Sequence, residues 1–268
     1  MVSKARESQD WQRPWREFRA RANRAGLNRL WVFARSWSDS RLPNPSAAHL
    51  SPTYQRLVLL CGGGRQFWRR FGEENARDWV ASENPLDQFC EREVERLSTP
   101  LRTVDPSLVT AYPFKHPRQV WGVQSLLEGT ALGQPAPYGI GQDPRFGPWW
   151  AVRGILLTSL PLPLSSLPKF SACQFCTDTP CVSACPAGAV RREGFLWREC
   201  AQYRLDELTC REDCPARVAC PMGATFRYGL AQTRHHYRAS MRSVRAHLAP
   251  HPTLESGKTP AVTDTVDR

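Results

Sequence analysis

Eight of the ten cysteines lie between residues 173 and 220, and their spacing constrains the fold more than any other feature of the chain. The first group has the spacing Cys-x2-Cys-x4-Cys-x3-Cys-Pro. Both groups finish in Cys-Pro-x-Gly-Ala, at residues 185–189 and again at residues 220–224, which is an internal repeat at a separation of 35 residues. The repeat indicates a duplicated module with one group of thiols in each half.

The redox setting decides whether these thiols are disulfide bridges or metal ligands. The first twenty residues contain no apolar segment of the secretory type. The longest apolar run, residues 151–167, is interrupted by Arg153, Pro161 and Pro163 and is too polar to cross a membrane. We therefore expect a soluble cytoplasmic protein. Because the cytosol keeps thiols reduced, metal binding is a better interpretation than a disulfide framework.

Closely spaced thiolates followed by Cys-Pro are typical of cubane iron-sulfur clusters, in which three ligands come from one loop and the fourth from the other half. Zinc with four cysteine ligands is the alternative, but such sites seldom need two Cys-Pro-x-Gly-Ala turns. We therefore predict two [4Fe-4S] clusters with crossed ligand sets. One set is Cys173, Cys176, Cys181 and Cys220, and the other is Cys185, Cys200, Cys210 and Cys214.

The net charge of +11 is concentrated at the two ends of the chain. Residues 1–35 carry nine basic and three acidic side chains, and residues 233–268 carry six and three. The segment 11–24 predicts a basic helix with Trp11, Trp15 and Phe18 along one side. An aromatic side that packs on the body of the protein is a more common arrangement than an RNA-binding surface, so the charge alone does not indicate a nucleic-acid partner.

The sequence ahead of the cysteine groups predicts an α+β domain. The helical pattern from residue 11 ends at Gly26, and a second helix begins at Asn84, which can cap it, followed by proline. Strand patterns occur at residues 30–33, 57–60 and 150–157. A linker rich in Pro, Ser and Leu follows at 161–168. We expect an α+β domain at 1–165, a small two-cluster domain at 166–232, and a short helix with a tail that has little to bury at 233–268.

Two known families resemble parts of this chain. The cysteine segment is similar to the bacterial-type two-cluster ferredoxin domain over about sixty residues, although its second half departs from the usual spacing. The run Asp-Pro-Arg-Phe-Gly-Pro-Trp-Trp-Ala-Val-Arg-Gly-Ile-Leu-Leu at 143–157 resembles the signature of the cobalamin-C family of cyanocobalamin reductases and alkylcobalamin dealkylases. Weaker similarities at 57–71, 84–88 and 115–118 extend this resemblance over about residues 55–165.

The cobalamin-C resemblance implies a nitroreductase-like α+β fold that holds cobalamin. Trp149 matches the tryptophan that this family places beside the cobalt, and Arg153 matches an arginine used for glutathione binding. His116 and Gln124 match pocket positions. The residues themselves also allow a purely structural interpretation, in which Trp149 is a core aromatic residue and Arg153 is a paired arginine on a strand.

Three functions follow from these features. The first is an iron-sulfur oxidoreductase that passes electrons from an unknown donor to a corrinoid, and in this case FMN is a less favoured substitute for cobalamin. The second is a tRNA-modifying enzyme, since epoxyqueuosine reductase resembles this arrangement of domains. The third is an electron-transfer ferredoxin with no ligand of its own. A cavity beside Trp149 with a cluster facing it would support the two enzymes, whereas a packed core there would count against both of them and leave the electron carrier.

Overall fold

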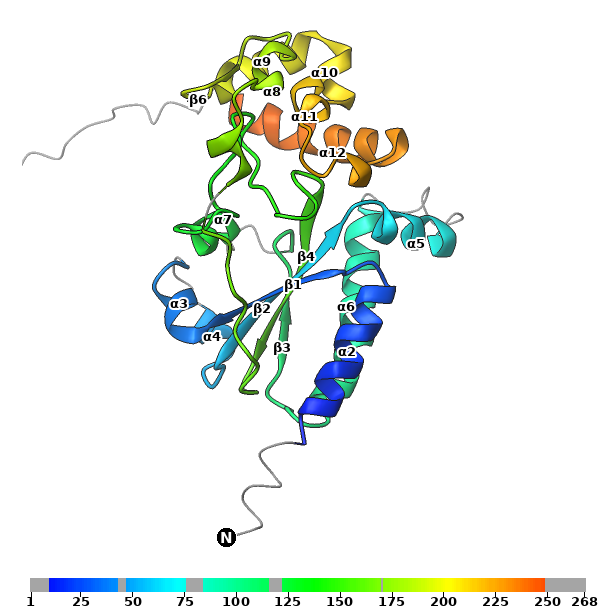
Figure 1. Ribbon diagram of the computed structural model, residues 1–268. Coiled ribbons are helices and arrows are strands. Elements are labelled where there is room, and N and C mark those ends of the chain that lie inside the picture. Colours follow the sequence, from blue (N-terminus) through cyan, green and yellow to red (C-terminus); the bar gives the residue numbers. More distant parts are fainter. Residues whose placement is uncertain (1–9, 43–46, 76–83, 116–121, 170, 249–268) are drawn as a thin grey trace, which may run out of the picture.

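The computed structural model describes residues 10–42, 47–75, 84–115, 122–169 and 171–248. Its first part is built on a four-stranded antiparallel sheet with the strand order β1-β2-β4-β3 (Figure 1). The strands are β1 (Arg29–Ala34), β2 (Arg56–Gly63), β3 (Val109–Ala111) and β4 (Trp150–Thr158). The three strands predicted from the sequence correspond to β1, β2 and β4. The central strands β2 and β4 are largely buried because helices cover both faces of the sheet.

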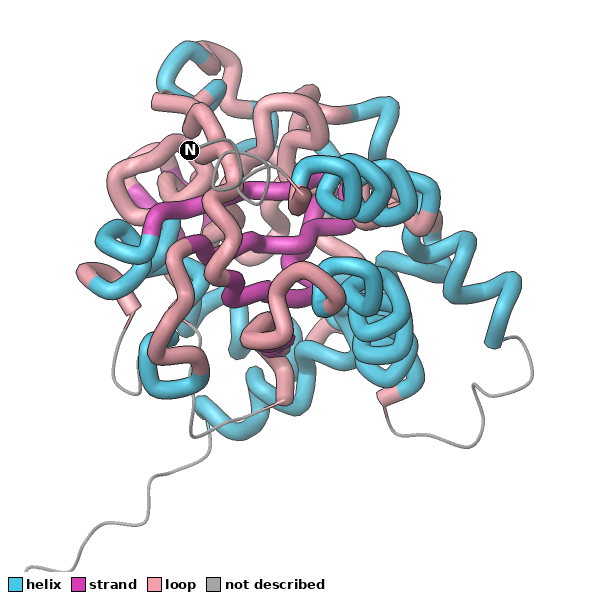
Figure 2. Tube along the Cα trace, turned by 90° about the horizontal axis from the view of Figure 1, so that it is seen from below, coloured by secondary structure: helices cyan, strands magenta, loops and turns pink. Residues whose placement is uncertain are grey.

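The helices form a layer on each face of the sheet, as Figure 2 shows in a view from below. One layer is α2 (Gln12–Arg24) and α6 (Pro85–Arg102), and the other is α3 (Arg35–Asp39), α4 (Ala47–Leu50) and α7 (Val123–Leu127). Leu156 of β4 belongs to the core beneath α2 and α6, and Leu157 belongs to the core on the other face. This alternation follows from the two-residue period of a strand. The mixed α+β fold predicted for this part is therefore confirmed.

The N-terminal helix α2 packs on the sheet through its aromatic side. Trp15 and Phe18 are buried, and their rings stack with centroids 5.4 Å apart. On the exposed side, Arg13 forms an ion pair with Glu17. The aromatic residues of α2 thus stabilise the core and are not available to stack on RNA bases.

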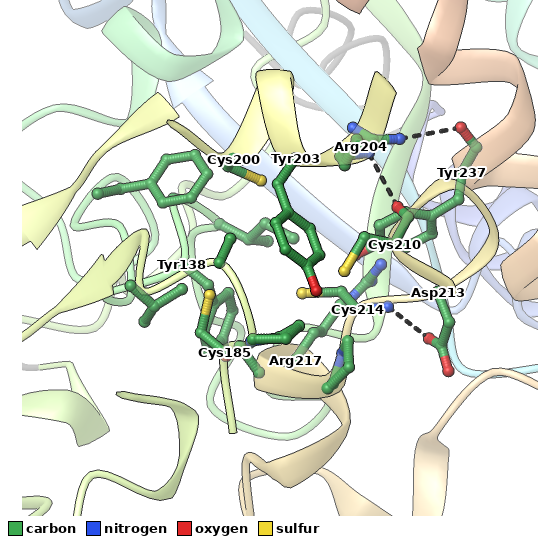
Figure 3. Close-up of a pocket in the computed structure, with 18 of the residues that line it drawn as sticks. Tyr138, Cys185, Cys200, Tyr203, Arg204, Cys210, Asp213, Cys214, Arg217 and Tyr237 are labelled. Carbon is green, nitrogen blue, oxygen red and sulfur yellow. Dashed lines mark hydrogen bonds between the residues drawn. The ribbon is translucent and has the colours of Figure 1, made fainter. Parts of the chain in front are cut away.

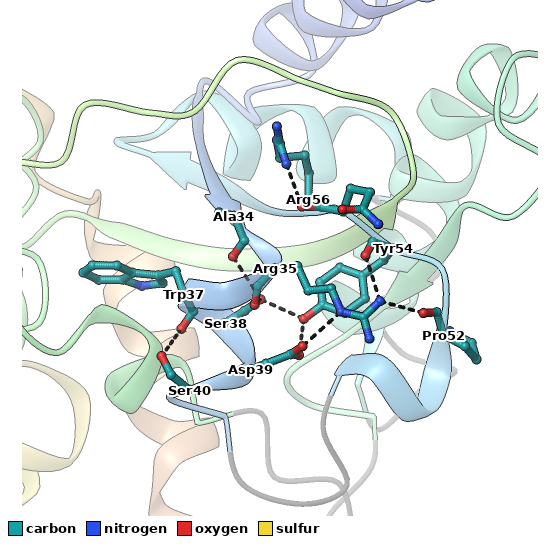
Figure 4. Close-up of polar contacts among 10 residues, drawn as sticks. Ala34, Arg35, Trp37, Ser38, Asp39, Ser40, Pro52, Tyr54 and Arg56 are labelled. Atoms are coloured by element: carbon teal, nitrogen blue, oxygen red, sulfur yellow. Dashed lines mark hydrogen bonds and ion pairs between the residues drawn. The ribbon is translucent and has the colours of Figure 1, made fainter.

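On the opposite face, a polar network holds α3 against the chain that precedes β2 (Figure 4). The hydroxyls of Ser38 and Tyr54 lie 2.8 Å apart, and Tyr54 also donates to the carboxylate of Asp39. Arg35 pairs with the same carboxylate at 3.1 Å. Because these groups satisfy one another at the edge of the second core, the network is a structural feature rather than a reaction centre.

The cysteine-rich segment forms a second unit beyond one end of the sheet (Figure 1). It contains short elements, of ten residues at most. They are η2 (Ala172–Phe175), α8 (Pro180–Ser183), β5 (Val190–Arg191), β6 (Gly194–Phe195), α9 (Trp197–Asp206), α10 (Leu208–Glu212), α11 (Pro215–Ala219) and η3 (Ala224–Phe226). The chain then continues into α12 (Leu230–Leu248), which is longer than the short helix that we expected, and the expected tail lies outside the described residues.

The two units are joined by a close backbone contact between residues 146–147 and 222–223. Gly147 and Gly223 both have positive φ, at 56° and 62°. A Cβ atom on either glycine would lie closer than 3.0 Å to backbone atoms of the other segment. Phe146 packs edge-on against Phe226, with ring centroids 4.8 Å apart. The contact therefore depends on the absence of side chains at these two positions.

α5 (Gln66–Asn75) follows β2 and completes the helices of the first unit.

Among the described residues, none of the helices is both long enough and apolar enough to cross a membrane.

Candidate functional site

The eight clustered thiols lie around two separate cavities. One cavity has a volume of about 230 Å³, and we call it the first thiol cavity; its thiols are those of Cys173, Cys176, Cys181 and Cys220. The other has a volume of about 360 Å³, and we call it the second thiol cavity (Figure 3); its thiols are those of Cys185, Cys200, Cys210 and Cys214. Each cavity thus draws on both cysteine groups, in the crossed arrangement that the spacing suggested.

The crossed grouping of the thiols arises from the packing of two short helices. α8 and α11 lie against each other, and a Cys-Pro turn follows each of them. Cys185, after α8, therefore lines the cavity of the second group, and Cys220, after α11, lines the cavity of the first. Gly188 and Gly223 occupy equivalent positions of the repeat and share a left-handed backbone, with φ of 60° and 62°. The repeated sequence thus encodes a repeated turn.

All ten cysteines are free thiols. Burial raises the pKa of Cys200 and of Cys210 to about 11, and the other thiols nearby add to the effect. Within the described residues, no three His, Cys, Asp or Glu side chains form a group that could hold a single metal ion. The thiols line the walls of two cavities rather than converging on one point.

Two arginines line the second thiol cavity (Figure 3). Arg204 donates through Nε to the carbonyl oxygen of Cys210 at 3.0 Å. Arg217 is only 7% exposed, and it donates to the carbonyl oxygen of Pro148 at 2.5 Å. The guanidinium of Arg217 also lies over the ring of Trp149, 4.5 Å from its centroid. The wall of this cavity is therefore continuous with the core between the two units.

Trp149 is a packed residue in this structure. It is 1% exposed, and its ring meets that of Tyr228 edge-on, with centroids 5.4 Å apart. It lines neither of the thiol cavities. Arg217 and Tyr228 fill the space on this side of Trp149. This packing counts against a ligand bound directly on the indole ring.

A third cavity lies between the start of α6 and the side of α12, and we call it the arginine cavity. Its volume is about 630 Å³, and its charged or titratable residues are Asp87, Arg153, Arg234, His235, His236, Arg238 and Arg242. Arg153 is 9% exposed, and its buried Nε atom has no hydrogen-bond partner. Asn84 makes no side-chain cap bond to α6, and instead its Oδ1 accepts from Arg242 at 2.6 Å. Arg234 and Arg238 are paired with the carboxylate of Glu212. Arg153 and Arg242 remain to face the cavity together with Asp87, and these two arginines suit an anionic group.

A β-bulge directs Arg153 into this cavity. The register between β2 and β4 shifts at Leu60 and Cys61, so that Leu60 pairs with Gly154 while Cys61 pairs with Val152. Arg153 is the extra residue, and its guanidinium lies 5.5 Å from the ring centroid of Phe67, on the α6 side of the sheet. Bulges commonly re-aim a side chain in this way.

His236 of α12 connects two of the cavities, since it lines both the second thiol cavity and the arginine cavity. Its Nε2 atom is 3.4 Å from Nη2 of Arg153. Desolvation lowers the pKa of His236 to about 2, with the charge of Arg153 adding to the effect, so that the ring is neutral. Sequence reasoning missed this residue. The only signal was the pair His235-His236 in the expected C-terminal helix.

The predicted corrinoid residues do not line one cavity. Gln124 is exposed on α7, where its Nε2 atom donates to the carbonyl oxygen of Gly133 at 3.5 Å. α7 covers the face of the sheet opposite to the one on which Arg153 lies. His116 lies outside the described residues. Of the four predicted residues, the structure therefore places only Arg153 at the arginine cavity, with Trp149 packed nearby.

The comparisons with known proteins show the fold. Epoxyqueuosine reductase from Bacillus subtilis is 13% identical and has a TM-score of 0.53, with 82% of this chain and 68% of that chain covered. An epoxyqueuosine reductase solved with an epoxyqueuosine-modified tRNA-Tyr stem loop is 12% identical, with a TM-score of 0.53 and coverage of 84% and 69%. CblC, a B12-trafficking protein of C. elegans and homologue of human MMACHC, is 14% identical, with a TM-score of 0.52 and coverage of 87% and 96%.

This chain shares the fold of both proteins. At such low identities the likeness concerns the fold alone, and at that level it agrees with the resemblances to the cobalamin-C family and to epoxyqueuosine reductase. The resemblance to a two-cluster ferredoxin stays a prediction. No protein-family model matches the chain, and no curated protein matches its sequence.

Proposed function

We propose that this protein is an iron-sulfur oxidoreductase that passes electrons from two [4Fe-4S] clusters to a corrinoid. The observation that carries the proposal is the arrangement of the thiols, four around each of two cavities. One of these cavities shares His236 with the arginine cavity. The folds of epoxyqueuosine reductase and CblC support a reductase or a corrinoid-related role. The cytoplasmic location follows from the sequence only and stays a prediction, and the electron donor is unknown.

The donor sets fit iron-sulfur clusters better than zinc. Four thiols and no imidazole or carboxylate ligand in each set are typical of a cubane cluster, whose irons are spread over several positions. A structural zinc site with four cysteine ligands seldom needs two Cys-Pro-x-Gly-Ala turns, which this chain has at residues 185–189 and 220–224. Bound clusters would supply single electrons and no bond chemistry. Burial raises the pKa of Cys200 and of Cys210 to about 11, so that these thiols are protonated at neutral pH unless a bound cation favours the thiolate.

The chain's own residues would bind and orient the ligand. Arg153 has an unpartnered buried Nε atom and Arg242 lies across the same cavity, so that both can donate to the phosphate of a cobalamin nucleotide tail. Neutral His236 separates this cavity from the second thiol cavity and limits the entry of water. We place the corrinoid at Arg153 and not against Trp149, since Trp149 is packed between Arg217 and Tyr228.

Two alternatives each have an observation in their favour. The arginine cavity and the basic ends of the chain also suit tRNA phosphates, as in an epoxyqueuosine-reductase-like enzyme, and this function predicts salt-dependent tRNA binding. The packing of Trp149 suits an electron carrier without a ligand. A carrier predicts full iron content and no binding of cobalamin or flavin.

The test begins with anaerobic purification of the full chain and quantification of iron and sulfide. We expect about eight irons per chain, four for each set of thiols. Titration with hydroxocobalamin and alkylcobalamins, followed by absorbance, should then shift the cobalamin bands to the base-off form. Arg153→Ala should weaken this binding at least about tenfold, which corresponds to about 1.4 kcal/mol.

Arg245→Ala is the control, because Arg245 is an exposed arginine of α12, the helix beside the arginine cavity, and lines no part of that cavity. It should leave cobalamin binding unchanged. Full iron content without any spectral change would exclude the corrinoid and leave the carrier. Binding of tRNA in its place would support the tRNA-modifying enzyme, a yellow flavin chromophore would identify FMN, and a chain that takes up no iron would exclude all three functions.

A further inference from the structure

The two thiol cavities differ in charge. Two arginines, Arg204 and Arg217, line the second thiol cavity together with one carboxylate, that of Asp213. Asp213 accepts a hydrogen bond from the backbone N–H of Cys214 at 2.7 Å. Among the described residues that line the first thiol cavity, none is charged; apart from its thiols these are Pro137, Tyr138, Gln142, Ala172, Thr179, Pro180, Pro221 and Met222.

Neutral hydrogen-bond donors do not distinguish the cavities. Tyr138 lies within hydrogen-bond reach of the Cys220 thiol in the first cavity. Tyr237 lies within hydrogen-bond reach of the Cys214 thiol in the second. Gln142 adds a weak donor to Cys220, with 3.7 Å between Nε2 and Sγ. The difference that remains is the positive charge of the arginines.

Arg217 is held in place independently of the thiols. It is buried between the rings of Trp149 and Tyr228, with its guanidinium carbon 4.5 Å and 5.0 Å from their centroids. One of its Nη atoms donates to the carbonyl oxygen of Pro148, and its Nε atom has no hydrogen-bond partner. A buried guanidinium with an unsatisfied donor is costly unless an anion lies nearby. A cluster with four thiolate ligands is such an anion.

We infer that the two clusters have different reduction potentials, and that Arg217 makes the cluster of the second thiol cavity the more readily reduced one. The inference rests on the proposed function, because it needs both clusters. Reduction adds one negative charge to a cluster, and a fixed cation beside it stabilises the reduced form. With both clusters bound, one electron would move from the reduced cluster in the first cavity to the oxidised cluster in the second, and no bond would form or break.

The position of the cavities indicates the direction in which electrons would pass between clusters of different reduction potential. The second thiol cavity shares His236 with the arginine cavity, whereas the first has no residue in common with it. Near the first cavity, Phe175 is 74% exposed directly beside Cys176. Electrons would therefore be received at the first cluster and pass downhill to the second, which lies against the ligand.

The test is a redox titration of the anaerobically purified full chain, with the reduced clusters followed by electron paramagnetic resonance. The wild type should show two separate midpoint potentials. Arg217→Gln should move the higher midpoint to a more negative potential and leave the lower one in place, and Arg217→Lys should restore much of the shift. Gln142→Leu, in the first cavity, should move only the lower midpoint. Arg198→Gln is the control, because Arg198 is exposed on the same unit and lines neither thiol cavity.

Each outcome decides between the inference and the function on which it rests. Two clusters with one common midpoint, or an Arg217→Gln variant with unchanged potentials, would overturn the inference and leave the proposed function intact. Should Arg217→Gln lose iron, Arg204→Gln provides the same measurement on the second arginine. Absence of iron from the wild type would instead overturn the proposed function.

Discussion

Trp149 and Arg153 are four residues apart in the sequence, yet the structure gives them different environments. Trp149 precedes β4 and is packed against Arg217 and Tyr228 from the other unit. Arg153 follows the shift in register and reaches a cavity on the α6 side of the sheet. The proposed ligand site therefore rests on Arg153 and not on Trp149. His236 lies beside Arg153, and its neutral ring affects stability.

The stability of the protein should fall below about pH 6.5 because of His236. Its pKa is lowered to about 2 in the folded protein, whereas an unfolded histidine has a pKa of about 6.5. The unfolded state thus binds more protons below pH 6.5, and the loss is up to about 1.4 kcal/mol per pH unit. Thermal unfolding between pH 7 and pH 5 should show a smaller loss for His236→Asn than for the wild type.

His49→Asn is the control for this measurement, because His49 is exposed on α4. It should follow the wild-type curve. Parallel curves for wild type and His236→Asn would contradict a neutral buried ring at position 236.

At the level of elements, the repeat of α8 and α11 explains both the turns and the crossing of the thiols. Each helix begins at a proline and is followed by Cys-Pro and a left-handed glycine, Gly188 in one copy and Gly223 in the other. The copies differ in their surroundings. A Cβ atom at Gly188 would meet nothing within 4 Å, whereas one at Gly223 would meet the backbone of Phe146.

These two glycines give a matched pair of alanine substitutions. Gly188→Ala should cost only the left-handed conformation, about 1–2 kcal/mol. Gly223→Ala has the same conformational cost, and its Cβ atom also forces residues 222–223 away from residues 146–147. It should therefore destabilise the protein by about 1–3 kcal/mol more than Gly188→Ala does. The two losses are compared by thermal unfolding. Equal losses of stability in the two variants would show that residues 222–223 and 146–147 can move apart without destabilising the protein.

At the level of the whole molecule, neither half of the cysteine segment completes a site alone. The first thiol cavity needs Cys220 from the end of the second half, and the second needs Cys185 from the end of the first. The sheet unit also contributes, since Tyr138 lines both cavities from the stretch ahead of β4. Folding of the sheet, packing of α8 on α11 and filling of the cavities should therefore be coupled.

Single serine substitutions test the crossed sets. With crossing, Cys220→Ser should lose the cluster of the first cavity and retain about four irons and the higher midpoint potential, and Cys185→Ser should retain the lower midpoint. Iron analysis and the redox titration measure both. If Cys220→Ser instead kept the lower midpoint, each cysteine group would fill its own site and the crossed assignment would be wrong.

Much of the fold was readable from local sequence. The strands around residues 30, 57 and 150, the helix that begins at Pro85 and the buried side of α2 all follow from short-range patterns of apolar residues and helix-start residues. The two Cys-Pro repeats likewise predicted the crossed grouping of the thiols, and the packing of α8 against α11 brings each group around its own cavity.

Tertiary structure alone decided the surroundings of those thiols. Arg153, Arg217 and His236 come from different segments of the chain, and their surroundings depend on a register shift in β4 and on where α12 packs. The same long-range packing filled the space beside Trp149, which the sequence left open between a ligand pocket and a core. Sequence patterns therefore determined the elements and the thiols, whereas desolvation and charge around them arose only when the two units came together.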